Sequence, residues 1–223
     1  MAQQIEASVH IDVISDVVCP WCFLGKRRLD AAVRMVPEIP VRVLFRPFFL
    51  DPTIPREGMS RRDYLAGKFG EGTLDGIHDQ LIAIGEAEGV PYKFDLITRS
   101  PNSMNAHRLL RWAAVAGTQP QVLEALFMAY WSWGQDIGDI EVLKTIATVN
   151  GFRGEDIERV LKSDEGVKDV LEEVAMAERI GVTGVPTFIL NSKQGVVGAQ
   201  PAEVLANAIR KVAAGGGGND AKN

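Results

Sequence analysis

The sequence predicts a mixed α/β fold in which a long helical segment interrupts a sheet-forming framework. Near the N-terminus, residues 9–14 alternate apolar and polar side chains, which is typical of a strand. Apolar residues then recur at helical spacing as far as Pro37, and a second strand is predicted at 41–49. A strand, a helix and a strand within about 40 residues indicate a βαβ unit.

The middle of the chain is predicted to be helical throughout. Helices are expected at 60–69, 73–88, 103–116, 120–133, 139–150 and 154–162, with Gly89, Gly117 and Gly151 where helices end. Ser60 with Asp63 resembles a capping box, and Asp139 is a candidate N-cap. Because we find no strand signal in this segment, we predict an all-helical insertion.

The C-terminal part returns to mixed structure. We expect a helix at 165–180, a loop at 181–184, strands at 186–191 and 195–198, and a last helix at 202–213, before a Gly-rich tail at 214–223 that should be disordered. The chain thus divides into a discontinuous domain (1–50 and 165–213) and an inserted helical domain (51–164). Without the insertion, the order of elements is that of a thioredoxin fold. The insertion lies between the second strand and the helix that precedes the Pro186 strand.

Composition narrows the functional classes. The chain has 223 residues and a net charge of −5, which disfavours a nucleic-acid partner held by phosphate contacts. No apolar run approaches the length of a membrane span. The first eight residues lack the basic and apolar regions of a secretory signal. We therefore expect a cytoplasmic protein with neither a nucleic-acid nor a membrane partner.

Two cysteines form the most informative motif, Cys-Pro-Trp-Cys, at the start of the first predicted helix. Pro20 suits the first helical turn, where its missing N–H costs nothing. Unpaired N–H groups and the macrodipole at this end favour a negative charge, so we expect the reactive thiolate form of Cys19 to be stabilised. Cys22 lies one turn later and can attack a mixed disulfide formed at Cys19. We assign Cys19 as the nucleophile and Cys22 as the resolving thiol.

Three further roles for the cysteine pair are less favoured. A structural zinc site usually needs four ligands, and His10, His78 and His107 lack metal-binding spacing. Inert buried thiols and a fixed structural disulfide are the other two roles, and a reducing compartment disfavours the disulfide. We predict no metal site.

A second motif surrounds Pro186. A proline that starts a strand after a Gly-rich loop is a candidate for a cis peptide bond, with an ordinary trans proline as the alternative. In a thioredoxin-type fold this bond lies against the active cysteines. It would turn the Val185 backbone toward an extended substrate. The upstream cysteine pair favours the cis isomer.

Four segments resemble one known family. Residues 14–26, ISDVVCPWCFLGK, resemble the active-site segment of the DsbA family, most closely its cytoplasmic FrnE-like branch. PNSMNAHRLL at 101–110 resembles a helix start in that branch's inserted domain, GVPTF at 184–188 its cis-proline loop, and GAQP at 198–201 its final turn. The segments occur in the family's order and span nearly the whole chain before the tail. The resemblance implies disulfide exchange on a protein or small thiol substrate.

The same superfamily leaves two alternatives open. It includes 2-hydroxychromene-2-carboxylate isomerases and kappa-class glutathione transferases, which typically carry serine at the position of Cys19 and use glutathione. Because both thiols are present, we predict a redox enzyme that requires no cofactor, with glutathione as a candidate co-substrate. A glutathione-dependent isomerase or transferase acting on an aromatic molecule is the first alternative, and a non-catalytic redox-sensing module the second. Relatives often pair, so a homodimer is a candidate assembly.

Further residues are expected near the site. Trp21, which replaces a histidine of periplasmic DsbA, should be exposed and contact substrate, so DsbA's strongly oxidising character is not carried over. Asn102 and His107 are candidates for substrate binding, His107 through a substrate carboxylate. Asp16 could accept a proton or cap the helix, with a plain loop carboxylate as the alternative. The residues Met128, Tyr130, Trp131 and Trp133 either wall the cleft or pack in the core.

Overall fold

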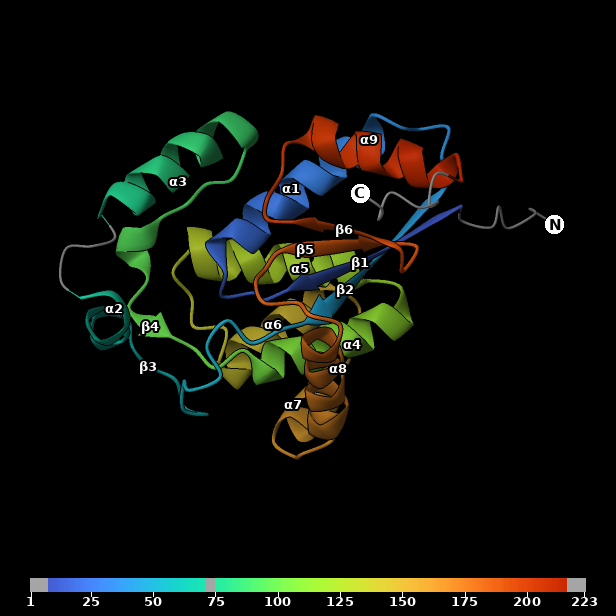
Figure 1. Cartoon of the computed structure of the whole chain (residues 1–223). Coiled ribbons are helices and arrows are strands. Elements are labelled where there is room, and N and C mark those ends of the chain that lie inside the picture. Colours follow the sequence, from blue (N-terminus) through green and yellow to red (C-terminus); the bar gives the residue numbers. More distant parts are fainter. Residues whose placement is uncertain (1–7, 71–74, 216–223) are drawn as a thin grey trace.

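The computed structural model describes residues 8–70 and 75–215. Its centre is a four-stranded sheet in the order β2-β1-β5-β6 (Figure 1). The strands are β1 (Val9–Ser15), β2 (Val41–Pro47), β5 (Thr187–Leu190) and β6 (Gln194–Val197). β2 runs parallel to β1, and β5 and β6 continue antiparallel. The fully buried Val13 lies opposite both Phe45 and Phe188, so β1 forms the middle of the core.

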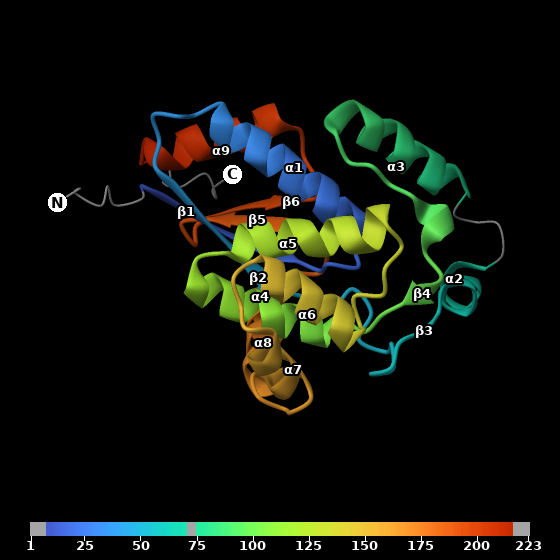
Figure 2. The same cartoon turned by 180° about the vertical axis from the view of Figure 1, so that it is seen from behind.

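Helices cover both sides of the sheet. α1 (Pro20–Arg34) and α9 (Ala202–Ala213) pack together above it in Figure 1, and α4 (Met104–Ala116), α6 (Ile140–Val149), α7 (Gly154–Leu161) and α8 (Val167–Arg179) lie below. α5 (Gln119–Phe127) runs beside β2, as Figure 2 shows from behind. The Gln119 side-chain amide pairs with both the N–H and the C=O of Phe45, at 3.0 and 2.9 Å. It thereby satisfies backbone groups that an edge strand would leave unpaired.

The segment between β2 and α8 is not all-helical, which corrects the prediction. A ribbon of two-residue strands, β3 (Met59–Ser60) and β4 (Arg99–Ser100), closes off the part of it that holds the first two helices, and a 3₁₀ turn, η1 (Phe94–Leu96), precedes β4. Strands this short carry no alternation that a sequence pattern could reveal. α2 (Arg61–Phe69) and α3 (Asp75–Glu88) lie at the left of Figure 1.

Most predicted helix limits are confirmed within a few residues. The Ser60 side chain accepts a bond from the Asp63 N–H, and Asp139 accepts one from the Glu141 N–H at 2.8 Å, so both predicted caps are present. The helix predicted at 120–133 instead ends as a π-helical turn, η2 (Met128–Ser132). Residues 73–74 of one predicted helix and 216–223 of the predicted tail lie outside the described residues.

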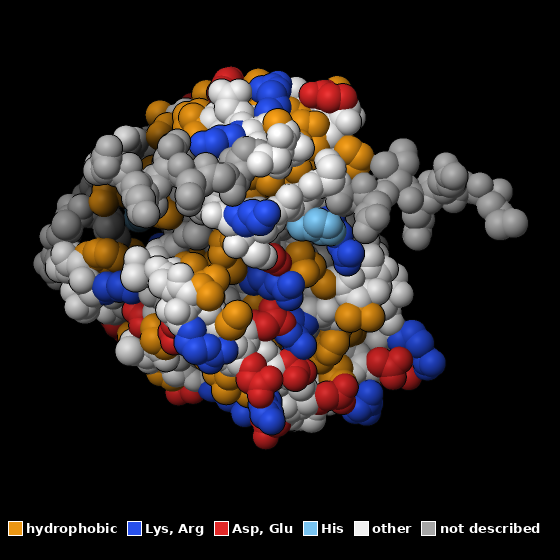
Figure 3. Space-filling view, turned by 45° about the vertical axis from the view of Figure 1, so that its right-hand side comes forward, with side chains coloured by type: hydrophobic (Ala, Val, Ile, Leu, Met, Phe, Trp, Pro, Cys, Tyr) orange, Lys and Arg blue, Asp and Glu red, His pale blue; other side chains and the backbone are white. Residues whose placement is uncertain are grey.

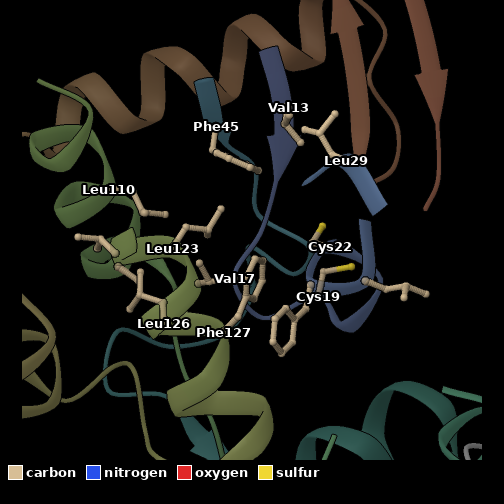
Figure 4. Packing of buried hydrophobic residues seen from close by; sticks show 14 of the residues in the cluster. Val13, Val17, Cys19, Cys22, Leu29, Phe45, Leu110, Leu123, Leu126 and Phe127 are labelled. Atoms are coloured by element: carbon tan, nitrogen blue, oxygen red, sulfur yellow. The ribbon is translucent and has the colours of Figure 1, made fainter. Parts of the chain in front are cut away.

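One hydrophobic cluster joins the sheet framework to the inserted helices. Leu110 and Leu123 lie nearest Phe45 in Figure 4, and both belong with Val13, Phe45 and Leu126 to the same buried cluster. The division into domains at residues 51 and 164 therefore stays a prediction.

None of the described helices combines the length and apolar character needed to cross a bilayer. Figure 3 shows acidic and basic side chains mixed over the lower surface, and α7 carries such pairs as Glu158–Lys162.

Candidate active site

Cys19 occupies the N-cap position of α1, with Pro20 in the first turn. Its backbone is extended, its N–H donates to the Asp16 C=O at 3.1 Å, and its own C=O accepts the Cys22 N–H at 3.0 Å. The two cysteines thus lie in the same first helical turn, both as free thiols and both buried (Figure 4). Cys19 Sγ lies 3.7 Å from the Val185 carbonyl oxygen.

Cys22 is a buried thiol with a raised pKa. Burial raises its pKa well above the usual 9.0, and the neighbouring Cys19 raises it further by hydrogen bonding and charge. Bonds from the Ser15 side chain and the Asp16 backbone act in the opposite direction but do not outweigh burial. Cys22 therefore keeps its proton at neutral pH, which suits a thiol that reacts second.

The Val185–Pro186 peptide bond is cis, and this turn faces the cysteines. The Pro186 carbonyl accepts the Gly198 N–H at 2.8 Å, which ties the turn to the end of β6. Val185 is half-buried, and no acceptor engages its N–H within the described part of the chain. A free N–H beside the Cys19 thiol can donate a hydrogen bond to the carbonyl of an extended substrate.

His107 does not line an open cleft, which differs from its expected role. It is 3% exposed, and its Nε2 lies 3.2 Å from Asp16 Oδ1 and 3.1 Å from the Phe48 carbonyl oxygen. Two acceptors around one nitrogen require that Nε2 carries the proton. Asp16, 1% exposed, also accepts the Leu50 N–H at 2.8 Å. Asp16 and His107 therefore form a buried pair that holds the segment leading to Cys19.

Trp21 differs from its expected exposure, and Asn102 has partners within the chain. Trp21 is half-buried and packs against the hydrophobic cluster, because α3 and the residues after it shield this end of α1. The Asn102 side chain donates to the Ile54 C=O at 2.8 Å and accepts the Met104 N–H at 3.0 Å. It also lines a small cavity that includes Val18, so it remains a candidate for contact with substrate.

Two aromatic residues support the cysteine segment in a way that the sequence patterns do not reveal. The Trp131 indole N–H donates to the Val17 C=O at 3.0 Å, and the Tyr92 hydroxyl donates to the Pro20 C=O at 2.6 Å. Burial raises the pKa of Tyr92, so the hydroxyl keeps its proton. Trp131 comes from the π-helical turn; Tyr130 is buried beside it, whereas Trp133 is 60% exposed. The aromatic stripe is therefore mainly core packing.

Metal chemistry receives no support from the described residues. Nowhere in residues 8–70 and 75–215 do three or more His, Cys, Asp or Glu side chains gather as ligands.

The sheet order, the cysteine pair at the start of α1 and the adjacent Val185–Pro186 turn define the class of thioredoxin-fold proteins with a paired-cysteine site. Residues 10–210 match the model of the DSBA-like thioredoxin domain. The chain belongs to this family, which confirms the resemblance seen in the sequence. Membership supports a redox or isomerase enzyme.

Individual relatives agree with this placement. The chain is 26% identical over 213 residues to the uncharacterized protein YwbO of Bacillus subtilis, and the aligned region covers 91% of this chain and 96% of YwbO. A probable DsbA oxidoreductase of Streptomyces coelicolor superposes with a TM-score of 0.85 at 29% identity, over 96% of this chain and 93% of that one.

Two more distant structures share the fold. A 2-hydroxychromene-2-carboxylate isomerase has a TM-score of 0.69 at 19% identity, over 93% of this chain and 97% of that chain. The cytosolic disulfide reductase DsbM of Pseudomonas aeruginosa, solved with glutathione, has a TM-score of 0.60 at 20% identity, over 92% and 96%.

Proposed function

We propose that this chain catalyses thiol–disulfide exchange, as an oxidoreductase or isomerase, with Cys19 as nucleophile and Cys22 as resolving thiol. The observation that carries the proposal is the place of Cys19 at the N-cap of α1, with its Sγ 3.7 Å from the Val185 carbonyl oxygen. The helix N-terminus favours the thiolate. We assign four further residues to substrate positioning. Two of them follow Cys19 in the sequence, Pro20 and Trp21, and two form the turn that faces its sulfur, Val185 and Pro186.

The reaction follows from the two thiols. The Cys19 thiolate attacks one sulfur of a substrate disulfide, the substrate S–S bond breaks, and one substrate thiolate leaves. Cys22 loses its proton and attacks the Cys19 sulfur, which releases the second substrate thiolate. The protein dithiol gives up two electrons and two protons in becoming a disulfide, and the substrate disulfide gains them. The reverse sequence oxidises a dithiol substrate.

Substitution of the resolving thiol tests this mechanism. Cys22→Ser should accumulate a mixed disulfide between Cys19 and substrate, detectable by intact-protein mass spectrometry, because nothing then attacks that bond. Wild type equilibrated in glutathione buffers should form a reversible Cys19–Cys22 disulfide with a potential near the glutathione range. Absence of both species would exclude the mechanism.

A glutathione-dependent isomerase or transferase is the second candidate. The likeness to the isomerase and to DsbM solved with glutathione favours it. Such an enzyme needs only the residue at position 19, so Cys22→Ser would keep its activity. A non-catalytic redox sensor would form the disulfide but show no multiple turnover with excess disulfide and reductant.

The remaining expectations belong to the same proposal. A thiol or disulfide substrate, a cytoplasmic location and glutathione as co-substrate agree with the likeness to the cytosolic reductase. A homodimer stays a prediction from the family resemblance, tested by light scattering of the purified protein.

A further inference from the structure

A cavity of about 240 Å³ lies beside the segment that carries the reactive cysteine. Val18, the residue before Cys19, forms part of its wall, and the chain after β2, the residues that lead into α4 and Leu171 of α8 form the rest. The wall is mainly apolar, with contributions from Phe49, Ile54, Met104 and Leu171. A cavity of this size accepts a short aliphatic arm of a ligand rather than a folded peptide.

Hydrogen-bond donors at the start of α4, next to this cavity, have no partner among the described residues. Ser103, which lines it, occupies the N-cap position and is 5% exposed, yet its hydroxyl bonds to no described residue and does not cap the helix. Asn102 instead accepts the Met104 N–H, at 3.0 Å. The N–H groups of Asn105 and Ala106 meet no acceptor in the described ranges. A helix N-terminus with free N–H groups and a free hydroxyl binds a negative group.

Charge around the cavity selects the kind of anion. No described lysine or arginine lines it, and Asp51 is the acidic residue in its wall. The Asp51 carboxylate accepts bonds from Lys68 at 2.7 Å and from the Thr53 hydroxyl at 2.6 Å, so its charge is compensated. Neutral donors and an apolar wall suit a single carboxylate better than a phosphate, which arginine and lysine usually hold.

We propose that this cavity binds the carboxylate of a small aliphatic disulfide or thiol, while the sulfur of that molecule reaches Cys19. The inference rests on the proposed function and names its substrate class. Ser103 is a substrate-binding residue in this account, since its hydroxyl donates to the carboxylate.

Single-turnover kinetics test the substrate class. Pre-reduced protein is mixed with dithiodipropionate, which carries carboxylates, or with bis-hydroxyethyl disulfide, which is uncharged; each is reduced to two thiols as the protein forms its disulfide. Ser103→Ala should lower the second-order rate constant for dithiodipropionate by about tenfold, as expected for the loss of a hydrogen bond to a charged group. The rate constant for bis-hydroxyethyl disulfide should change less than about twofold. Thr118→Val is the matched control. It removes the hydroxyl of another N-cap residue whose side chain makes no capping hydrogen bond, and Thr118 does not line this cavity. Equal losses for both disulfides would overturn the proposal.

A second variant keeps the test valid if α4 needs its N-cap. Ser103→Asp places a carboxylate where the ligand carboxylate would lie and can cap the helix, which supports folding. The rate with dithiodipropionate should fall by more than about tenfold, and the rate with bis-hydroxyethyl disulfide should not. An unchanged preference between the two disulfides would contradict the carboxylate site.

Binding without redox chemistry separates this proposal from the proposed function. The double variant Cys19→Ser, Cys22→Ser is titrated with methylthiopropionate and with its methyl ester. Saturable amide shifts at Asn105 and Ala106, seen with the acid, absent with the ester and lost in Ser103→Asp, would support the site. Shifts confined to other residues would overturn it. If neither disulfide reacts with wild type, the proposed function fails, and this titration alone decides the cavity.

Discussion

Gly25 of α1 and Pro186 make a contact that a side chain at position 25 would prevent. A Cβ added to Gly25 would lie 2.8 Å from Cγ of Pro186 and 3.3 Å from Cζ of Phe188. The close approach brings the Val185–Pro186 turn against the helix whose first turn holds both cysteines. The distance between Cys19 Sγ and the Val185 carbonyl therefore depends on a glycine two turns along α1.

Gly25→Ala should push the Pro186 turn away from α1. We expect a loss of about 1–3 kcal/mol in the free energy of unfolding, as for other overpacked sites, and a slower reaction of Cys19 with disulfides. Urea denaturation and single-turnover rates measure the two effects. Gly67→Ala is the control: nothing lies within 4 Å of its added Cβ, and alanine should stabilise α2 by about 0.5–1 kcal/mol. Similar behaviour of the two variants would contradict the steric role of Gly25.

His107→Leu should destabilise the protein strongly. It removes the Nε2 proton that Asp16 and the Phe48 carbonyl share, and leaves a buried carboxylate with fewer partners. We expect a loss of about 2–4 kcal/mol, and a smaller loss for His107→Gln, whose amide can still donate. The exposed His10→Leu should change stability by less than about 0.5 kcal/mol. Urea denaturation checks these values. If His107→Leu left the free energy of unfolding unchanged, the buried pair would be excluded as a stabilising contact.

Arg108→Met should destabilise the protein, because it removes the hydrogen bonds that hold the segment between α7 and α8. Arg108 is fully buried on α4 and donates to backbone carbonyls of Val160, Ser163 and Glu165. We expect a loss above about 3 kcal/mol, because three carbonyls, that of Val160 in a buried hydrogen bond, lose their donor. Arg108→Lys should rescue little, since an ammonium cannot form the guanidinium fork. Arg62→Met, at a 91% exposed side chain, is the matched control; full rescue by lysine in thermal unfolding would disprove the fork geometry.

The raised pKa of Cys22 predicts how the stability of the reduced protein depends on pH. Burial favours the protonated thiol in the folded state, so this stabilisation is complete below pH 9.0, the usual thiol value, and is lost as pH rises above it. The free energy of unfolding of the reduced protein should fall there by up to about 1.4 kcal/mol per pH unit for this group. Reduced Cys22→Ala should lack this component. Parallel declines of wild type and Cys22→Ala in denaturant titrations between about pH 8 and pH 10 would contradict the assignment.

The sequence predicts local features better than long-range partners. The strand at 9–14, Pro20 at the helix start and the Asp139 cap depend on neighbouring residues, and a pattern reveals them. The role of His107 depends on Asp16, 91 positions away, and a single helical histidine has no local signal for such a partner. Trp131 is similar, because its indole bonds to Val17 across 114 positions.

Two more differences have physical causes of their own. The β3–β4 ribbon has two residues on each side, which is too short for an alternating pattern. The expectation that Trp21 is exposed treats α1 as a surface helix, whereas α3 packs against it. The place of both cysteines at a helix start is therefore predictable from the motif, and the residues that support this segment are not.

The sheet order has a consequence for biosynthesis. β1 and both cysteines are made well before β5, which covers one edge of β1. Val185, whose carbonyl oxygen lies near Cys19 Sγ, follows Cys19 by 166 positions. A nascent chain leaving the ribosome therefore exposes two thiols and an unpaired strand edge until its C-terminal hairpin emerges, and such edges and surfaces are open to wrong partners. The cysteine pair is translated before the Val185–Pro186 turn that lies against Cys19, so both thiols stay open to other partners until that turn is made.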